Sequence, residues 1–202
     1  DEKYYELALK LRGWGRRSTL YKETEDLERR FNSKIENIDY DDKYIFDEIA
    51  YNFLPSEISA AFALVQMKKL EKNIKKRIEN YQYLKEGIGI SNNFFIPNSY
   101  KNVETGWLAF PVILENKLSN FRTTFQKYLE SYGIQTRTIF SGNIIKQPMS
   151  KNFNWESIGT FEISDEVTKG GILVGCHGKL SKEDLNFIVS KFLECEKKVL
   201  SI

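Results

Sequence analysis

Residues 51–70 read YNFLPSEISAAFALVQMKKL, a turn that runs into the start of a long amphipathic helix. Apolar residues recur at three- and four-residue steps from Ile58 onward, which predicts a helix over about residues 56–86. Ser56 is its predicted N-cap. Asn52 lies just before that helix end, where free N–H groups and the positive end of the helix dipole favour an anion. Asn52 is therefore either a phosphate ligand or a residue that only forms the turn.

The same segment resembles the G-Y-N-x-x-x-x-E-x-x-A-A motif of the DegT/DnrJ/StrS family, which comprises pyridoxal-phosphate enzymes that modify nucleotide-linked sugars. The chain matches this motif at Tyr51-Asn52, Glu57 and Ala60-Ala61. It departs from the family at Ala50, which replaces glycine, and at Leu54, where the family often has Arg or Lys. In the family the matching Asn reaches across a homodimer to the cofactor phosphate. The resemblance therefore implies that Asn52 binds the cofactor of a partner subunit.

The composition is that of an ordinary globular protein. The 202 residues are 41% hydrophobic and 29% charged, which is enough for a substantial core in one or two domains. Thirty Lys and Arg residues are interleaved with 28 Asp and Glu residues, which argues against a nucleic-acid partner. No apolar run approaches the roughly 20 residues of a membrane span, and the first residues do not resemble a signal peptide, so we expect no membrane partner and a cytoplasmic location. Cys176 and Cys195 lack metal-ligand spacing, so we expect reduced thiols and no metal site.

The first residues already show helical spacing, at Tyr4, Leu7 and Leu11, so we expect a helix there and a chain that is part of a larger protein. The resemblance implies that residues 1–17, which end in GWGRR, follow the cofactor-lysine region of the family. The Schiff-base lysine, or the histidine that replaces it, is then expected upstream of residue 1, with no catalytic residue in this chain. The chain alone is expected to be inactive.

The loop after this first helix carries a possible substrate contact. Trp14, Arg16 and Arg17 either line a substrate entrance or are exposed loop residues. Among them, Arg16 is the candidate for substrate binding.

Apolar runs and helical periods alternate through the rest of the chain. The pattern predicts strands at residues 107–114, 134–140 and 171–175, and helices at 119–132 and 181–200. Pro111 points to an edge or a bulge in the first of these strands, because proline cannot donate to the ladder. Residues 18–47 are polar and irregular, which predicts a long excursion or lid. Together these elements predict an α+β domain in which helices cover a few strands.

The resemblance adds a domain plan. It implies the small C-terminal domain of a pyridoxal-phosphate-dependent transferase of the aspartate aminotransferase-like fold type I, preceded by a long helix and the tail end of the large domain. We expect the end of the large cofactor-binding domain and an excursion loop at residues 1–55, a connecting helix that packs in a dimer at 56–86, and the small domain at 87–202.

A second motif, IQTRTIFSGNIIKQP, occupies residues 134–148. Strand alternation places Gln135 and Arg137 on one face. Arg137 is suited to grip a phosphate or carboxylate through two parallel hydrogen bonds, and a surface arginine with a salt-bridge partner is the equal alternative.

This segment resembles the T-R-x-x-F-x-G-N-x-x-x-Q-P stretch of the branch that includes the nucleotide-linked 4-keto-6-deoxyhexose 3-dehydratases. Most aminotransferases of the family have a His-Tyr-Pro sequence and a following His here, and this chain has neither. The resemblance implies that Arg137 and Asn143 hold the sugar nucleotide.

A third motif, GGILVGCHGKL at residues 170–180, places the only histidine of the chain in a glycine-rich turn between a strand and a helix. His177 is either a surface turn residue or part of a binding site. The segment resembles the C-terminal strand-turn-helix of the family, whose turn lies near the sugar pocket. His177 is therefore a candidate for substrate binding.

These resemblances imply a homodimeric enzyme that uses pyridoxal 5'-phosphate or pyridoxamine 5'-phosphate on a nucleotide-linked 4-keto-6-deoxysugar, for lipopolysaccharide, O-antigen or other surface polysaccharide. Two reactions stay open. In transamination, with glutamate as amino donor, a lysine carries the cofactor; in 3-dehydration a histidine replaces that lysine and the aminated cofactor assists loss of the 3-hydroxyl. The GN…QP segment favours dehydration. A non-catalytic domain that binds a sugar nucleotide or a partner is the alternative outside enzymes.

Overall fold

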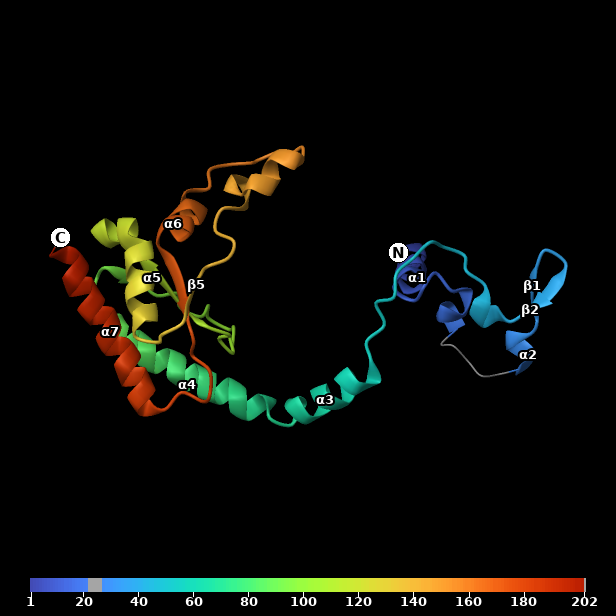
Figure 1. Ribbon diagram of the computed structural model, residues 1–202, viewed down its shortest axis with the longest axis horizontal. Helices are drawn as coiled ribbons and strands as arrows, with labels where there is room; N and C mark the ends of the chain where they lie inside the picture. Colours follow the sequence, from blue (N-terminus) through green and yellow to red (C-terminus); the bar gives the residue numbers. More distant parts are fainter. Residues whose placement is uncertain (22–26, 202) are drawn as a thin grey trace. The chain divides into compact units, whose positions relative to one another are not determined.

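The computed structural model describes residues 1–21 and 27–201. The chain divides into two compact units, Asp1–Met67 and Lys68–Ile202, and each is described by itself. Figure 1 shows the helices and strands of both units.

The first unit is built mainly from helices and turns. Its elements are α1 (Glu2–Arg12), a 3-10 turn (Arg17–Tyr21), α2 (Leu27–Arg30), β1 (Ser33–Ile35), β2 (Ile38–Tyr40), a second 3-10 turn (Asp42–Tyr44) and α3 (Glu57–Met67). Asp1 caps α1 by accepting the Lys3 N–H, which confirms the helix predicted at the start of the chain. Within the predicted excursion at 18–47, β1 and β2 form an antiparallel hairpin that the sequence did not predict, because Glu36 turns it at φ +54°, where glycine or asparagine is usual. Residues 22–26 of that excursion lie outside the described part.

The helix predicted over residues 56–86 is two helices in the structure. The first is α3, and the second is α4 (Leu70–Ile88), with Lys68 and Lys69 between them. Ser56 does cap α3, because its Oγ accepts the Ser59 N–H at 3.1 Å. The apolar period does not reveal the interruption, since Ile74 follows Leu70 at the same four-residue step. The prediction of one continuous helix is therefore wrong, and the break coincides with the boundary between the units.

The second unit contains a four-stranded antiparallel sheet. Its strands are β3 (Phe94–Phe95), β4 (Phe110–Leu114), β5 (Thr136–Thr138) and β6 (Gly171–Val174), in the spatial order β3-β4-β6-β5. The three predicted strands are present, although β4 and β5 are shorter than expected, and β3 is too short to show a pattern in the sequence.

Pro111 does not mark an edge strand, because β4 lies inside the sheet. It pairs with Leu173 of β6, whereas β3 pairs only with Ile113 and Leu114. The proline thus occupies the part of β4 that has one neighbour, where a missing N–H donor is tolerated.

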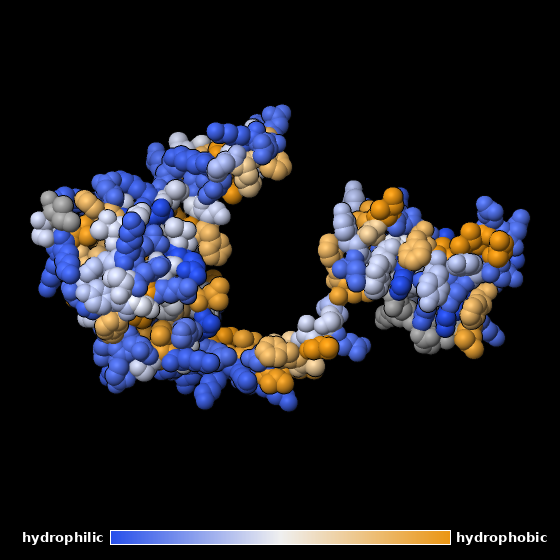
Figure 2. All heavy atoms as spheres, viewed as in Figure 1, coloured by the Kyte–Doolittle hydropathy of each residue, from blue (hydrophilic) through white to orange (hydrophobic). Residues whose placement is uncertain are grey.

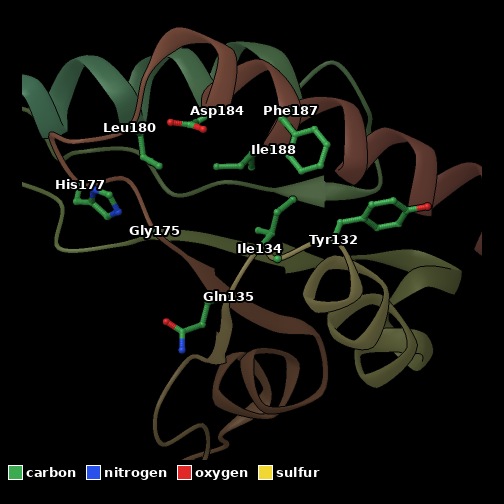
Figure 3. Close-up of a pocket in the computed structure, with 10 residues that line it drawn as sticks. Tyr132, Ile134, Gln135, Gly175, His177, Leu180, Asp184, Phe187 and Ile188 are labelled. Carbon is green, nitrogen blue, oxygen red and sulfur yellow. The ribbon is translucent and has the colours of Figure 1, made fainter.

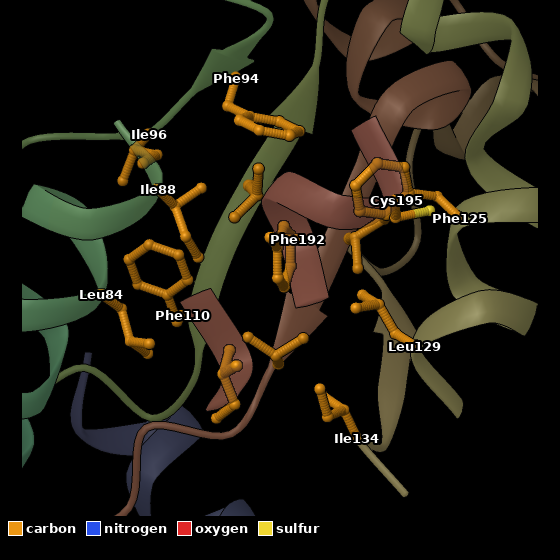
Figure 4. Packing of buried hydrophobic residues seen from close by; sticks show 14 of the residues in the cluster. Leu84, Ile88, Phe94, Ile96, Phe110, Phe125, Leu129, Ile134, Phe192 and Cys195 are labelled. Carbon is orange, nitrogen blue, oxygen red and sulfur yellow. The ribbon is translucent and has the colours of Figure 1, made fainter. Parts of the chain in front are cut away.

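Helices cover one face of this sheet. The covering elements are α4, a 3-10 turn (Asn116–Phe121), α5 (Arg122–Ser131) and α7 (Lys182–Leu200). On β4 the side chains of Phe110, Val112 and Leu114 are fully buried, as period-2 alternation requires. Phe94, Phe125 and Phe192 meet in the centre of the core, with ring centroids 5.4, 5.8 and 6.0 Å apart (Figure 4). Ser181 and Asp184 form a capping box on α7, at the start of the helix predicted over residues 181–200.

A lobe of residues 139–161 connects β5 to α6 (Glu162–Gly170), and it extends away from the sheet (Figure 1). It holds two short 3-10 helices, Ile144–Lys146 and Pro148–Asn152. Phe140, Phe153 and Ile158 of the lobe are all largely exposed. The combination of helices and an antiparallel sheet in this unit confirms the predicted α+β class.

Candidate functional site

In the first unit, the turn after α1 runs antiparallel to the segment that contains Asn52. Backbone hydrogen bonds join Trp14 N–H to Tyr51 O at 2.8 Å and Phe53 N–H to Arg12 O at 2.8 Å. Gly13 lies opposite Asn52. The backbone of Asn52 is therefore held on a defined path, and its side chain extends from that path.

Gly15 explains why the two segments approach so closely. Its φ is +76°, and a Cβ atom there would lie 1.9 Å from the carbonyl oxygen of Glu48. Only glycine fits this contact. Gly15 is thus required by its close approach to the backbone of Glu48.

The side chain of Asn52 is exposed, and it makes no hydrogen bond among the residues that the structure describes. Ser56 occupies part of the N-terminus of α3 by capping Ser59. The amide of Asn52 is consequently available for a ligand. The prediction that it binds a cofactor phosphate stays a prediction.

Arg16 lies on the same scaffold, because it pairs with Phe46 in a second antiparallel bridge. Its guanidinium carbon lies 4.4 Å from the ring centroid of Trp14, a cation–π contact. Its Nε is buried and has no hydrogen-bond partner among the described residues. A buried N–H without an acceptor is costly, so the Arg16 Nε is an unsatisfied donor of this scaffold, and its predicted role in substrate binding stays a prediction.

Arg17 has a different environment. Its Nε and Nη2 donate to Asp47 Oδ1 at 3.1 and 2.8 Å, and Lys10 Nζ lies 3.0 Å from the other oxygen of that carboxylate. Arg17 first, and then Lys10, hold the pKa of Asp47 below its usual range. Arg17 is thus committed to an ion pair that joins the turn after α1 to the segment before Asn52.

In the second unit, Arg137 lies in the middle of β5, opposite Leu173. Its neighbour Thr136 is buried and Arg137 is exposed, which confirms the predicted alternation. Arg137 Nη1 donates to the carbonyl of Thr136 at 2.7 Å, and no ion pair to Arg137 occurs among residues 1–21 and 27–201. Glu130 interacts electrostatically with Arg137 but makes no direct ion pair with it, so the salt-bridge alternative has no direct partner among the described residues, and the side chain of Arg137 is exposed.

Asn143 is 5% exposed and its amide has two partners within the chain. Its Oδ1 accepts the Ile145 N–H at 3.1 Å, and its Nδ2 donates to Asp165 Oδ1 at 2.8 Å. Lys146 Nζ lies 2.7 Å from the other oxygen of Asp165. Lys146 first, and then Asn143, keep the pKa of Asp165 below its ordinary value. The structure thus places Asn143 in a hydrogen-bonded turn, and its expected contact with a substrate stays a prediction.

His177 lies in the exposed turn between β6 and α7. Its Nδ1 accepts the Lys179 N–H at 3.3 Å, so in the neutral ring the proton lies on Nε2. Asn80 of α4 holds the same turn by donating to the carbonyl of His177 at 2.8 Å. Asn80 was not predicted to belong to the site. The only sign of it in the sequence is that a polar residue occupies a position on the apolar face of a helix.

His177 borders a hollow of about 390 Å³. Figure 3 shows side chains of α7 on one side of this hollow and residues 132–135 on the other. Its apolar lining is made by Tyr132, Ile134, Leu180, Phe187 and Ile188, and its polar lining by Gln135, His177 and Asp184. Such a hollow can hold the apolar face of a ring and hydrogen-bond its edge.

The three candidate residues of the second unit, Arg137, Asn143 and His177, do not lie together. Thr136 pairs with Val174 at the end of the ladder near His177, and Thr138 pairs with Ile172 at the end from which the chain continues to Asn143. His177 and Asn143 therefore lie beyond opposite ends of the β5–β6 ladder, with Arg137 between them.

Within the described parts of the chain, no helix is both long enough and apolar enough to span a bilayer. The same residues contain no group of three or more His, Cys, Asp or Glu side chains arranged to hold a metal ion.

Comparison with known proteins relates this geometry to a family. The sequence profile of the DegT/DnrJ/EryC1/StrS aminotransferase family matches residues 18–193. The lipopolysaccharide biosynthesis protein RfbH of Salmonella typhimurium is 29% identical over 169 residues, which are 82% of this chain and 39% of that protein.

Two solved structures share the fold. A variant of GDP-4-keto-6-deoxymannose-3-dehydratase with bound GDP-perosamine matches with a TM-score of 0.75 at 22% identity, over 95% of this chain and 48% of that one. The E. coli GDP-4-keto-6-deoxy-D-mannose-3-dehydratase with bound hydrated PLP matches with a TM-score of 0.73 at 22% identity, again over 95% of this chain and 48% of that one. The chain thus spans less than half of the length of the proteins it matches, and the likeness confirms the predicted fold.

Proposed function

The chain belongs to the DegT/DnrJ/EryC1/StrS aminotransferase family, and from this we propose that it forms part of an enzyme that modifies a nucleotide-linked 4-keto-6-deoxysugar with pyridoxal 5'-phosphate or pyridoxamine 5'-phosphate. The product would enter lipopolysaccharide, O-antigen or another surface polysaccharide, and the reaction would take place in the cytoplasm. The enzyme would be a homodimer. One structural observation supports the proposal. The side-chain amide of Asn52 and the Nε of Arg16 lack hydrogen-bond partners among the described residues, and both residues lie on segments joined by antiparallel backbone bridges.

Among the reactions of the family, 3-dehydration has the better support. The proteins that share the fold include 3-dehydratases, one of them with a bound nucleotide-linked sugar. The T-R-x-x-F-x-G-N-x-x-x-Q-P segment of this chain is complete at Thr136, Arg137, Phe140, Gly142, Asn143, Gln147 and Pro148. Transamination with glutamate as amino donor is the second candidate, because aminotransferases give the family its name.

The residues of the first unit fit the proposed cofactor. The exposed amide of Asn52 is a neutral donor suited to a phosphate oxygen, and we assign it to the phosphate of the cofactor bound by the partner subunit. When bound, the cofactor supplies an electron sink for the carbon at which the reaction occurs. Arg16, whose guanidinium carbon lies 4.4 Å from the ring centroid of Trp14, is assigned to an anionic group of the substrate.

The second unit supplies the remaining substrate contacts. The exposed donors of Arg137 suit the diphosphate of a sugar nucleotide, because a guanidinium offers two parallel N–H groups to a phosphate. The Nε2–H of His177 is assigned to the sugar nucleotide as a hydrogen-bond donor. Asn143 acts with Arg137 by shaping the turn that follows β5. These residues bind and orient the substrate, and we assign no proton transfer to this chain.

The absorption spectrum of the complete enzyme with added pyridoxal phosphate, before and after borohydride, tests the proposal. Bound cofactor that borohydride does not attach to the protein is the expected result, and it identifies the lysine-less dehydratase. Covalent attachment would show a lysine and identify an aminotransferase. The absence of bound cofactor would refute the enzyme proposal and leave a domain that binds a sugar nucleotide or a partner.

An Asn52→Ala variant is the matched variant for this measurement. If Asn52 binds the cofactor phosphate, the variant requires a higher concentration of pyridoxal phosphate for the same absorbance, by about tenfold for one lost hydrogen bond to a charged group. Asn37→Ala, in the exposed hairpin turn of the first unit, is the control and should leave the titration unchanged.

A further inference from the structure

The base of the lobe at residues 139–161 is joined to α6 by a compact set of hydrogen bonds. The Asn143 N–H donates to Thr168 Oγ1 at 2.6 Å, and Thr168 Oγ1 donates in turn to the carbonyl of Ser164 at 2.7 Å. Asn143 Nδ2 donates to Asp165 at 2.8 Å. Asp165 and Thr168 are three residues apart, so they lie on one face of α6. Two side chains of α6 thus hold both the backbone and the side chain of Asn143.

The close approach of the turn to α6 depends on Gly142. Its φ is +64°, and a Cβ atom there would lie 2.5 Å from Thr168 Oγ1. Gln147 closes the same turn from the other side, because its Nε2 donates to the carbonyl of Ser141 at 3.0 Å. Arg122 anchors the end of α6 by donating to the carbonyl of Thr168 at 2.8 Å. Hydrogen bonds therefore hold the turn at 141–147 at both of its ends and against α6, and Arg122 holds α6 in place.

These bonds restrict what Asn143 can do. Its Oδ1 is used by Ile145, its Nδ2 by Asp165, and 95% of the residue is inaccessible, since its exposed fraction is 5%. A ligand that bound either group would have to displace or share a hydrogen bond already made within the chain, at a residue that is almost entirely buried. The geometry therefore favours an indirect role for this residue.

We propose that Asn143 is a positioning residue, and that Asp165 and Thr168 of α6 hold its turn in the conformation from which the lobe and Arg137 engage the nucleotide-linked sugar. The identity of the ligand in this inference rests on the proposed function. The positioning role rests on the hydrogen bonds described above. A turn held before the ligand arrives binds more tightly, because less conformational entropy is lost on binding. Gly142, Asn143 and Gln147 of the motif then maintain the conformation of the turn.

An exchange of partners between positions 143 and 165 separates positioning from direct contact. Asn143→Asp alone places two carboxylates 2.8 Å apart and should open the turn. Asn143→Asp combined with Asp165→Asn restores one donor and one acceptor, with the polarity reversed, and keeps an acceptor for the Ile145 N–H. Thr168→Val removes the acceptor for the Asn143 N–H, and Thr168→Ser restores it. Glu166→Ala, an exposed acidic residue on the same helix, is the control.

Two quantities are measured on the complete enzyme. The first is the hydrogen exchange of the backbone amides at positions 143 and 145, and the second is the dissociation constant of GDP, UDP and dTDP. We expect exchange to become at least about tenfold faster in Asn143→Asp and in Thr168→Val, with a parallel loss of affinity. The double variant and Thr168→Ser should recover both quantities, and Glu166→Ala should change neither.

Each other outcome contradicts a specific claim. If the double variant recovers slow exchange but not affinity, the amide of Asn143 contacts the ligand directly and the positioning role is refuted. If Asn143→Asp and Thr168→Val leave the exchange unchanged, α6 does not hold the turn. If the unaltered enzyme binds none of the three nucleotides, the proposed substrate class fails, and this result is distinct because it appears without any substitution.

Discussion

Arg16 and Arg17 are neighbours in the sequence, but their side chains have opposite environments. Arg17 makes an ion pair with Asp47, whereas the Nε of Arg16 is buried without a partner among the described residues. The ion pair therefore occupies Arg17 within the chain, and the role of Arg16 in substrate binding stays a prediction. The sequence alone does not show the different environments of the two side chains, because Asp47 lies 30 positions after Arg17.

The ion pair of Asp47 predicts a pH dependence for the first unit. Because Arg17 and Lys10 lower the pKa of Asp47 in the folded state, its contribution to stability is complete above its unfolded pKa of about 3.9 and is lost as the pH falls through the lower folded value. Asp47→Asn should lower the free energy of unfolding by about 1 kcal/mol at pH 7, after allowance for solvent screening. Urea unfolding monitored by Trp14 fluorescence, in a background in which Trp107 and Trp155 are replaced by Phe, measures this difference at pH 7 and at pH 3, and the difference should shrink at pH 3.

Asp39→Asn serves as the control for this measurement. Asp39 pairs with Lys34 at 3.2 Å in the hairpin, but both side chains are largely exposed, so the pair should contribute little. An equal loss in the two variants would show that the Asp47 pair has no special role.

At the scale of elements, α6 and α7 show how helix ends are used. The N-terminus of α7 is closed by its own capping box, in which Ser181 Oγ accepts the Asp184 N–H at 3.1 Å and Asp184 accepts the Ser181 N–H at 2.8 Å. The hydrogen bond from the Ser181 N–H first, and the Ser181 side chain second, lower the pKa of the Asp184 carboxyl. The first turn of α6 instead directs Asp165 to the neighbouring turn. The N-terminus of α7 is thus capped by residues of its own first turn, whereas Asp165 in the first turn of α6 binds the turn at the base of the lobe.

The capping box predicts a measurable stability effect. Ser181→Ala should lower the free energy of unfolding of the second unit by about 1 kcal/mol, because the Asp184 N–H loses its acceptor. Thermal unfolding followed by circular dichroism measures the change. Ser190→Ala, at an exposed position inside the same helix, should have no cost, since alanine is the better helix former. A similar loss in both variants would contradict the role of the cap.

At the scale of the whole molecule, the chain holds separate structural units. The main core lies entirely in the second unit, with every member between Tyr81 and Val199. In the first unit the large side chains of α3 are exposed, including Ile58, Phe62 and Leu64, and Figure 2 shows apolar residues along this helix. The first unit is held by backbone bridges and ion pairs rather than by a comparable core.

This division predicts that core damage stays local. Phe192→Ala should remove about 3–5 kcal/mol from the second unit, because Phe192 is fully buried against Phe94 and Phe125. Hydrogen exchange should accelerate throughout residues 68–201 and remain unchanged in residues 1–21 and 27–67. Phe153→Ala, at an exposed position of the lobe, is the control. Accelerated exchange in both units would show that they unfold as one.

Local pattern was sufficient for much of this protein. The capping box at Ser181, the strands at β4, β5 and β6, the helix α1 and the family motifs were all readable from the sequence, because each depends on residues close together in the chain. The alternation of Thr136 and Arg137 was predictable for the same reason.

Other features depend on residues that are distant in the sequence, and only the tertiary structure decided them. Pro111 is tolerated because β3 pairs with β4 beyond it. The amide of Asn143 is occupied because Asp165, 22 positions later, faces it from α6. The interruption at Lys68 and Lys69 falls where one compact unit ends and the next begins. The sequence by itself therefore determined the family, the elements and the candidate residues, whereas packing determined which of their hydrogen-bonding groups remain available, because that depends on partners brought together by folding.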